Sequence, residues 1–196
     1  MLHDEPINPC LDLSVEENLP VLEDRKSLMF ADCVRDISCC AVNEKGEIVG
    51  GFFFVDLYME ETQLSGKHSE NAKMKIIEEA MDSIHAQYRS FRFKKNLPLR
   101  KNRVLKIVMR GVSQKYRRQR LASRALDRAI ALARQRGYSY LISETSSAYT
   151  KQTFLNRGGI SRGNLFYSSW SDSSGIVRFA DAEPPHESLD LMEIQL

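Results

Sequence analysis

The order of apolar and polar positions predicts helices and strands that alternate along most of the chain. Apolar side chains recur with the spacing of one helix face over 69–91, and again over 122–133, where Gly137 supplies a stop. Further helices are expected over 20–33 and from Ser146 or Ser147 to Arg157. The segments expected as strands are 38–42, 48–58, 104–112, 138–142, 160–170 and 189–195. This alternation favours an α/β fold with a mixed central sheet flanked by helices, in one domain that spans 1–196.

Two turns and one glycine refine the expected sheet. The run 43–47 separates the first two strands and predicts a hairpin between them. A smaller hairpin is expected about Ser174 and Gly175. Within 104–112, Gly111 is expected to mark a β-bulge.

Composition excludes several classes of protein. Of the 196 residues, 42% are hydrophobic and 28% are charged, which is close to the globular average and argues against bulk disorder. The longest apolar run, 48–55, is too short to cross a membrane, and the first residues do not resemble a signal peptide. Four cysteines without C-x-x-C spacing argue against a disulfide framework or a zinc site. We therefore expect a cytoplasmic protein without a metal or a membrane partner.

Charge is distributed unevenly, although the formal net charge is only +2. Residues 1–65 carry fourteen Asp and Glu against four Lys and Arg, whereas residues 100–136 carry thirteen Lys and Arg against one Asp. A basic segment suits a polyanionic ligand, and an acidic segment suits a cation. The alternative is that both sets only solvate a helix face and loops. Composition alone leaves both explanations open.

The segment from Val112 to Ala122 joins a strand directly to a helix and holds Arg117, Arg118 and Arg120. The first N–H groups of a helix have no backbone acceptors, and the helix dipole favours anions there. Arginine adds charge and paired donors that match phosphate geometry. The pattern predicts an anion site at this helix N-terminus. An exposed basic turn is the alternative.

The same segment, V-S-Q-K-Y-R-R-Q-R-L-A-S, resembles the acetyl-CoA loop of the GCN5-related N-acetyltransferases, whose pattern is Q/R-x-x-G-x-G/A. Arg117 fills the first position of that pattern and Ala122 the last, whereas Arg120 stands where the family usually has glycine. Arg120 could add a phosphate contact, or it could block close approach. The resemblance implies the acetyltransferase fold, acetyl-CoA as co-substrate, and coenzyme binding by Val112, Arg117, Arg118, Gln119, Arg120, Leu121 and Ala122.

Four further segments are similar, in the right order, to the insect- and nematode-type arylalkylamine N-acetyltransferases. They are D-E-P-I-N at 4–8, N-E-K-G-E-I-V-G at 43–50, S-S-A-Y-T at 146–150 and P-P-H at 184–186. This resemblance covers essentially the whole chain. It implies transfer of acetyl to the primary amine of a small molecule such as dopamine, octopamine or serotonin.

The resemblance also implies roles for individual residues. Glu5 matches the glutamate proposed as the general base, although it could instead cap or pair locally. A backbone amide near Val112 matches the group that polarises the thioester carbonyl. Phe154 stands where many members have a tyrosine that protonates the thiolate leaving group. The resemblance therefore implies that the hydroxyls of Ser146 and Thr150 are the proton donors here. Ser146 could equally be a helix cap.

Two other residue types could contribute to the amine pocket. His186 could orient the substrate, but a single histidine in a Pro-rich loop is more often a structural contact. Five aromatic residues could wall the pocket, but most are expected in the core because period-two strands bury one side; they are Phe52, Phe53, Phe54, Tyr58 and Phe166.

Other interpretations stay open at this point. One is a catalytically weak homologue that only binds coenzyme A or an amine. Another is a nucleic-acid-binding module based on 115–124, which the lack of interleaved aromatic residues disfavours. Members of the resembled branch have a strand and a helix ahead of D-E-P, so this chain is expected to be shortened at that end, leaving 38–42 with an unpaired edge. The sequence determines neither the amine nor the oligomeric state.

Overall fold

One mixed sheet of six strands, in the order β1-β2-β3-β4-β6-β5, organises the computed structural model, which describes residues 5–64, 66 and 68–196. The strands are β1 (Cys39–Val42), β2 (Ile48–Asp56), β3 (Val104–Val112), β4 (Tyr140–Thr145), β5 (Ile160–Phe166) and β6 (Ser188–Gln195). β3 and β4 are parallel, and the other neighbouring pairs are antiparallel. The expected α/β fold with a mixed sheet is confirmed.

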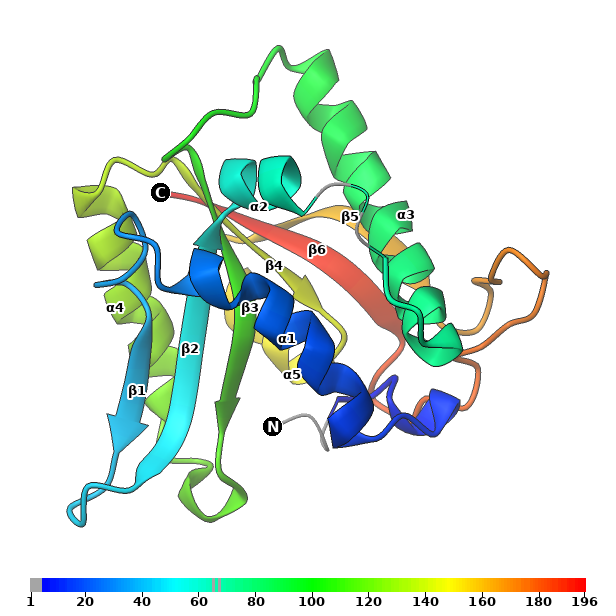
Figure 1. Cartoon of the computed structure of the whole chain (residues 1–196), viewed down its shortest axis with the longest axis horizontal. Helices are drawn as coiled ribbons and strands as arrows, with labels where there is room; N and C mark the ends of the chain where they lie inside the picture. Colours follow the sequence, from blue (N-terminus) through cyan, green and yellow to red (C-terminus); the bar gives the residue numbers. More distant parts are fainter. Residues whose placement is uncertain (1–4, 65, 67) are drawn as a thin grey trace.

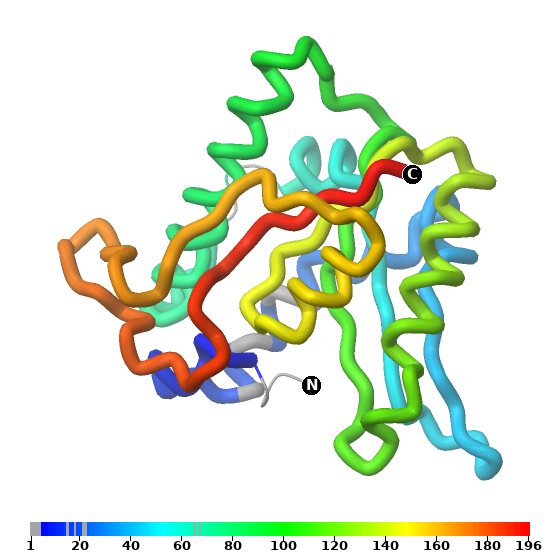
Figure 2. Tube along the Cα trace, turned by 180° about the vertical axis from the view of Figure 1, so that it is seen from behind, coloured from blue at the N-terminus to red at the C-terminus, as the bar shows by residue number. Residues whose placement is uncertain are grey.

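Helices cover both faces of this sheet. They are α1 (Val15–Met29), α2 (Leu57–Gln63), α3 (Ala72–Lys94), α4 (Leu121–Gln135) and α5 (Ala148–Leu155), with short 3-10 turns η2 (Pro9–Leu11) and η3 (Gln114–Tyr116). In Figure 1, α1, α2 and α3 lie in front of the sheet, and Figure 2 shows α4 and α5 on the opposite face. One buried cluster lies under α3 and another under α4 and α5, so the sheet separates two apolar cores.

The first helix begins earlier than the apolar pattern predicts. It starts at Val15 rather than at residue 20, because Ser14 and Glu17 form a reciprocal capping box. Ser14 Oγ accepts from the Glu17 amide at 3.2 Å, and the Glu17 carboxylate accepts from the Ser14 amide at 2.8 Å. The helix also ends earlier, at Met29.

The second strand ends earlier than predicted, because its last residue begins a helix. The Asp56 carboxylate accepts a hydrogen bond from the Met59 amide at 3.2 Å and so caps α2. The expected strand over 48–58 therefore stops at Asp56, and its last two residues belong to α2. Apolar residues on both sides of this boundary hide it from a pattern search.

The bulge lies elsewhere than expected. Gly111 pairs regularly with Gly51, and the register shifts instead between Phe53 and Phe54, which face Met109 and Ile107. The prediction of a bulge at Gly111 is therefore wrong. Glycine serves close packing here, since a Cβ on the neighbouring Gly50 would lie 3.0 Å from the Gly111 carbonyl oxygen. The bulge leaves Val108 as the extra residue of β3.

β3 and β4 pair along only part of β3. Their register runs from Val104 opposite Tyr140 to Ile107 opposite Ser143, after which the two strands separate (Figure 1). The rest of β3 stays paired with β2 on its other side, up to Val112. This separation leaves an unpaired strand edge near the middle of the sheet, where the functional site is found. No helix in the described part of the chain is long and apolar enough to cross a membrane.

Candidate active site

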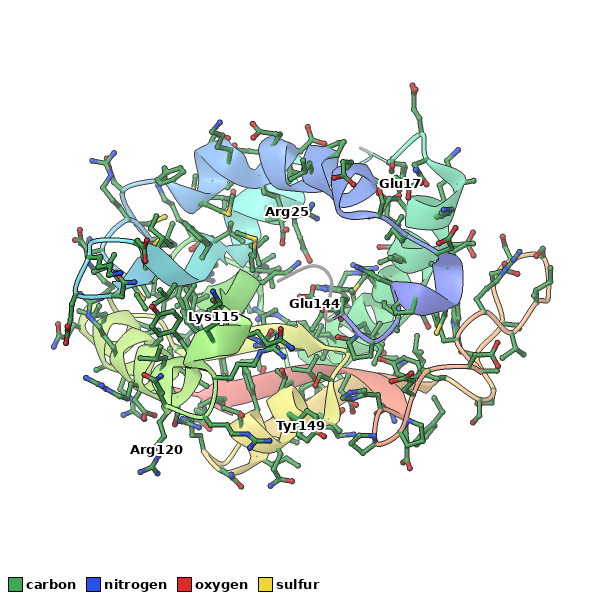
Figure 3. The ribbon with its side chains drawn as sticks, turned by 90° about the horizontal axis from the view of Figure 1, so that it is seen from below. Glu17, Arg25, Lys115, Arg120, Glu144 and Tyr149 are labelled. Carbon is green, nitrogen blue, oxygen red and sulfur yellow. The ribbon has the colours of Figure 1, made fainter. Side chains whose placement is uncertain are left out.

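Two cavities meet where β3 and β4 separate. The first has a volume of about 780 Å³ and lies between β3, the end of β4, α5 and the segment that leads into β6. The second has a volume of about 660 Å³ and lies between β3, α2 and α3. Four residues line both cavities, namely Glu5, Met81, Val108 and Glu144. Two carboxylates therefore stand at the junction, and Figure 3 shows Glu144 near the centre of the molecule.

Glu5 reaches this junction from the N-terminal segment. Its backbone carbonyl accepts from the Asn8 amide at 3.1 Å in a tight turn. Its carboxylate accepts a hydrogen bond from the hydroxyl of Ser146. Burial raises the pKa of Glu5, and the positive charge of Arg110 opposes that shift. Asp4, the preceding residue of the D-E-P segment, lies outside the described residues.

Ser146 is oriented by the turn between β4 and α5. Its carbonyl accepts a hydrogen bond of 2.7 Å from the Tyr167 hydroxyl. The residue at the helix N-cap is Ser147, whose side chain makes no capping bond. Ser146 is therefore not the helix cap, and its hydroxyl is directed to Glu5 instead. Thr150 follows one turn along α5 and lines the same cavity.

His186 does the capping that the serines do not. Its Nδ1 atom accepts a hydrogen bond of 3.2 Å from the amide of Ala148, which is the first residue of α5. Its ring also meets the Tyr149 ring edge-on, with 5.5 Å between centroids. His186 lines the first cavity as well, so it joins the loop before β6 to the helix that carries Thr150.

Arg110, on β3, is a site residue that the sequence analysis missed. It donates to Ser143 Oγ at 3.0 Å, and its guanidinium lies 5.6 Å from the centre of the buried Phe154 ring. Burial lowers the pKa of Arg110 to about 10, against the opposite effect of Glu5 and Glu144. The signal that could have found it is a charge at an inner position of an apolar strand.

The segment predicted to bind the coenzyme, Arg117 to Ala122, has an unusual backbone. Arg118 and Arg120 both have positive φ angles, 62° and 60°, in the left-handed region that favours glycine. Arg120 is the N-cap of α4, so the helix begins at Leu121. Residue 120 thus has the backbone conformation that favours glycine, the usual residue of the family pattern at this position, although it is an arginine. Figure 3 shows its side chain at the periphery of the molecule.

The residues predicted for coenzyme binding divide into two groups. Val112, Arg117 and Ala122 line the first cavity, whereas Arg118, Gln119, Arg120 and Leu121 do not. The Ser113 amide donates to the Val49 carbonyl on β2 at 2.7 Å. Because successive amides of a strand point to opposite sides, the Val112 amide faces away from β2, toward the edge that β4 leaves open.

A buried ionic network forms the base of the second cavity. Lys106 Nζ lies 2.9 Å from Glu60 and 2.7 Å from Glu144, while Arg25 lies 2.7 Å from Glu60. His85 Nε2 lies 2.5 Å from Glu144 Oε1. Burial alone would raise the pKa of Glu144, but Lys106 and His85 outweigh it and hold the pKa well below its usual value. This network was not anticipated, because each of its members looks like an ordinary surface charge in the sequence.

Comparison with known proteins agrees with the fold described above. The model of the acetyltransferase (GNAT) family matches residues 7–153. No curated relative matches the sequence significantly.

Three solved structures illustrate the likeness in fold. Arylalkylamine N-acetyltransferase 2 from Aedes aegypti is 22% identical, with a TM-score of 0.77, and the match covers 98% of this chain and 87% of that one. The polyamine N-acetyltransferase of Drosophila melanogaster is 18% identical, with a TM-score of 0.65 over 93% of this chain and 82% of that one. A variant of agmatine N-acetyltransferase is 17% identical, with a TM-score of 0.67 over 98% and 89%.

Proposed function

The chain belongs to the acetyltransferase (GNAT) family, and on that premise we propose that it transfers the acetyl group of acetyl-CoA to the primary amine of a small arylalkylamine, within a single domain of residues 1–196. One observation carries the proposal. The Glu5 carboxylate accepts the Ser146 hydrogen bond where the two cavities meet. A base at that junction serves an amine from the second cavity and an acyl donor from the first.

Acetyl-CoA is assigned to the first cavity because donors suited to it converge there. The open edge of β3 offers the Val112 amide for a thioester carbonyl. The first turn of α4 offers unpaired amides for a pyrophosphate, close to Arg117 and Ala122. Arg118, Gln119, Arg120 and Leu121 complete the proposed coenzyme loop.

Glu5 is the proposed general base. An alkyl ammonium with a pKa of about 10.4 is neutral in only roughly one molecule per thousand at neutral pH. Proton removal by Glu5, directly or through water, lets the amine nitrogen attack the thioester carbonyl carbon. The C–N bond forms, the C–S bond breaks, and coenzyme A leaves as a thiolate. Of the two protons that the ammonium nitrogen loses in becoming an amide, one passes to the thiolate and the other to solvent. A raised Glu5 pKa strengthens the carboxylate as a base.

Ser146 and Thr150 are the proposed proton donors to the thiolate. Ser146 already shares a hydrogen bond with Glu5, so a proton taken from the amine can pass from Glu5 through the Ser146 hydroxyl to sulfur. Phe154 has no hydroxyl and is fully buried, which fits a mechanism without a tyrosine acid. Thr150 lines the same cavity and is the second candidate.

The arylalkylamine class is favoured by the resemblance of four sequence segments and by apolar residues that line the second cavity, namely Leu57, Met74, Ile77 and Met81. A polyamine is the second candidate, because Glu61, Glu78 and Asp82 line the second cavity and suit a second positive charge. A weakly active homologue is the remaining alternative, motivated by Arg120. We also propose a cytoplasmic location, which the four free cysteines support.

A thiol-release assay over a panel of amines tests the proposal. The panel contains dopamine, tyramine, serotonin and spermidine, with a histone-like peptide as an outlier. We expect release with at least one arylalkylamine and none with the peptide. Preference for spermidine would replace the arylalkylamines by polyamines as the substrate class. No thiol release above background with any amine would contradict the enzymatic function.

A further inference from the structure

The junction of the two cavities holds a second carboxylate whose role the proposed reaction does not explain. Glu144, on β4, lines both cavities, as Glu5 does. The two side chains arrive from opposite parts of the chain, one from the N-terminal segment and one from the centre of the sheet. Both carboxylates therefore border the junction that an amine enters.

Glu144 is held as an anion by two partners that contact the same oxygen. Lys106 Nζ lies 2.7 Å and His85 Nε2 lies 2.5 Å from its Oε1 atom. Lys106 also pairs with Glu60. The side chains of Lys106 and Glu144 are nearly buried, with exposed fractions of 9% and 13%. A carboxylate with this support stays charged while a neighbouring group gains or loses a proton.

The other oxygen of Glu144 is available to a ligand. Among the described residues, none donates a hydrogen bond to Oε2. Within the same part of the chain, the one fully buried side-chain polar atom without a partner is Tyr138 Oη. Because Glu144 Oε2 has no donor among these residues and is not such a buried atom, it is accessible. We infer that it faces the cavities that Glu144 lines. A carboxylate oxygen left in this position suits a cationic donor.

The local charges favour an ammonium over an anion. Glu60 and Glu144 balance Arg25 and Lys106 within the network, so the network itself offers no excess positive charge. Glu5 adds a further negative charge when it is ionised, opposite Arg110. A primary ammonium brings three donors, enough for Glu144 Oε2 and Glu5 together.

We propose that Glu144 Oε2 binds the ammonium of the acceptor amine and positions it for Glu5, which then takes the proton. The inference rests on the proposed function and assigns the two carboxylates different tasks. Glu144 selects and holds the charged amine, and Glu5 converts it into a nucleophile. Lys106 and His85 act through Glu144, as positioning residues.

The test compares a protonated amine with its neutral alcohol analogue. Binding of tyramine and tyrosol, and of putrescine and 1,4-butanediol, is measured by calorimetry on the full chain with coenzyme A present. The ratio of the two dissociation constants reports recognition of the ammonium, independently of turnover. We expect at least one amine to bind about tenfold or more tightly than its alcohol, as for a hydrogen bond to a charged group.

The Glu144→Gln variant should lose that preference. Its amine affinity is expected to fall about 10- to 100-fold, so that the ratio approaches one, while alcohol binding stays within about twofold. The Glu5→Gln variant should keep most of the preference but lose turnover. Glu70→Gln, an exposed acid outside both cavities, is the matched control and should behave as the wild type. Glu144→Asp, which keeps the charge, should restore part of the preference.

Several results would overturn the assignment. Equal binding of amine and alcohol by the wild type, or no binding of any amine, excludes an ammonium site even if both Glu144 variants fail to fold. If folded Glu144→Gln shows the same ratio of amine to alcohol dissociation constants as the wild type, the ionic network around Glu144 has a structural role only. If the preference exists but no amine releases thiol from acetyl-CoA, the proposed function fails while the ammonium site stands.

Discussion

Ser146 donates a hydrogen bond to the carboxylate of Glu5 across 141 positions of sequence. One residue follows the central strand β4, and the other lies at the start of the described chain. Both line the first cavity. The contact links the proposed base to the proposed acid.

Ser146→Ala should weaken turnover and shift its pH dependence. A donor to a carboxylate stabilises the charged form, so its loss raises the pKa of Glu5 further. We expect kcat to fall about tenfold to a hundredfold and its acidic limb to move to higher pH. Thr153→Ala, further along α5 and outside both cavities, removes a hydroxyl that donates to the Tyr149 carbonyl and should leave turnover and its pH dependence nearly unchanged. Equal effects of the two substitutions would count against the Ser146 role.

Arg120→Gly should stabilise the protein and leave coenzyme binding intact or tighter. Arg120 has a φ of 60°, and glycine removes a cost of roughly 1–2 kcal/mol for that conformation. Urea unfolding and calorimetry with coenzyme A measure the two effects. Arg124→Gly is the matched control, because it places glycine inside α4 and should destabilise by about 1 kcal/mol. A loss of affinity beyond about tenfold would identify Arg120 as a phosphate ligand.

Lys106→Met should destabilise the fold strongly at neutral pH. It leaves Glu60 and Glu144 buried without their shared cation, at a cost of about 3–5 kcal/mol. The pKa values of both carboxyls are lowered in the wild type, so this stabilisation is present above their unfolded values near 4.5 and is lost as pH falls below them. The difference between variant and wild type in urea unfolding should therefore begin to shrink only as the pH falls below about 4.5. Lys45→Met, at an exposed turn, should have little effect at either pH.

Acetyl-CoA should raise the melting temperature more than a short DNA duplex does. The basic surface of α4 attracts any polyanion, but the first cavity offers a shaped site with oriented amides. Nonspecific binding to charge falls steeply with salt. Raising the salt from 50 to 200 mM should abolish any shift by DNA and keep the shift by acetyl-CoA. A coenzyme effect confined to low salt would favour charge binding alone.

Local patterns were sufficient where an element depends on its own residues. β3 has the predicted bounds because its apolar run and the flanking polar segments define it. The position of the bulge in β3 and the start of α2 were missed, because one depends on the register against β2 and the other on the capping carboxylate of Asp56. These are relations between segments, and periodicity does not report them.

The candidate site divides in the same way. Glu5, Ser146 and a coenzyme loop were predicted through resemblance to known motifs, and the structure brings Glu5 and Ser146 into contact. Arg110 and Glu144 were missed, because a single charge within a strand looks like a solvated residue until its neighbours are known. Their burial and mutual placement arise from the separation of β3 and β4.

The pH profile of kcat/KM for wild type and Glu5→Gln tests the central claim most directly, using the best amine of the panel. Because the pKa of Glu5 is raised, wild-type activity should fall on the acidic side through a limb above the usual value of 4.5. Glu5→Gln should lose about 10²- to 10⁴-fold in kcat/KM and no longer show that limb. Turnover by Glu5→Gln within about tenfold of wild type, with the same limb, would contradict the assignment of Glu5 as the base.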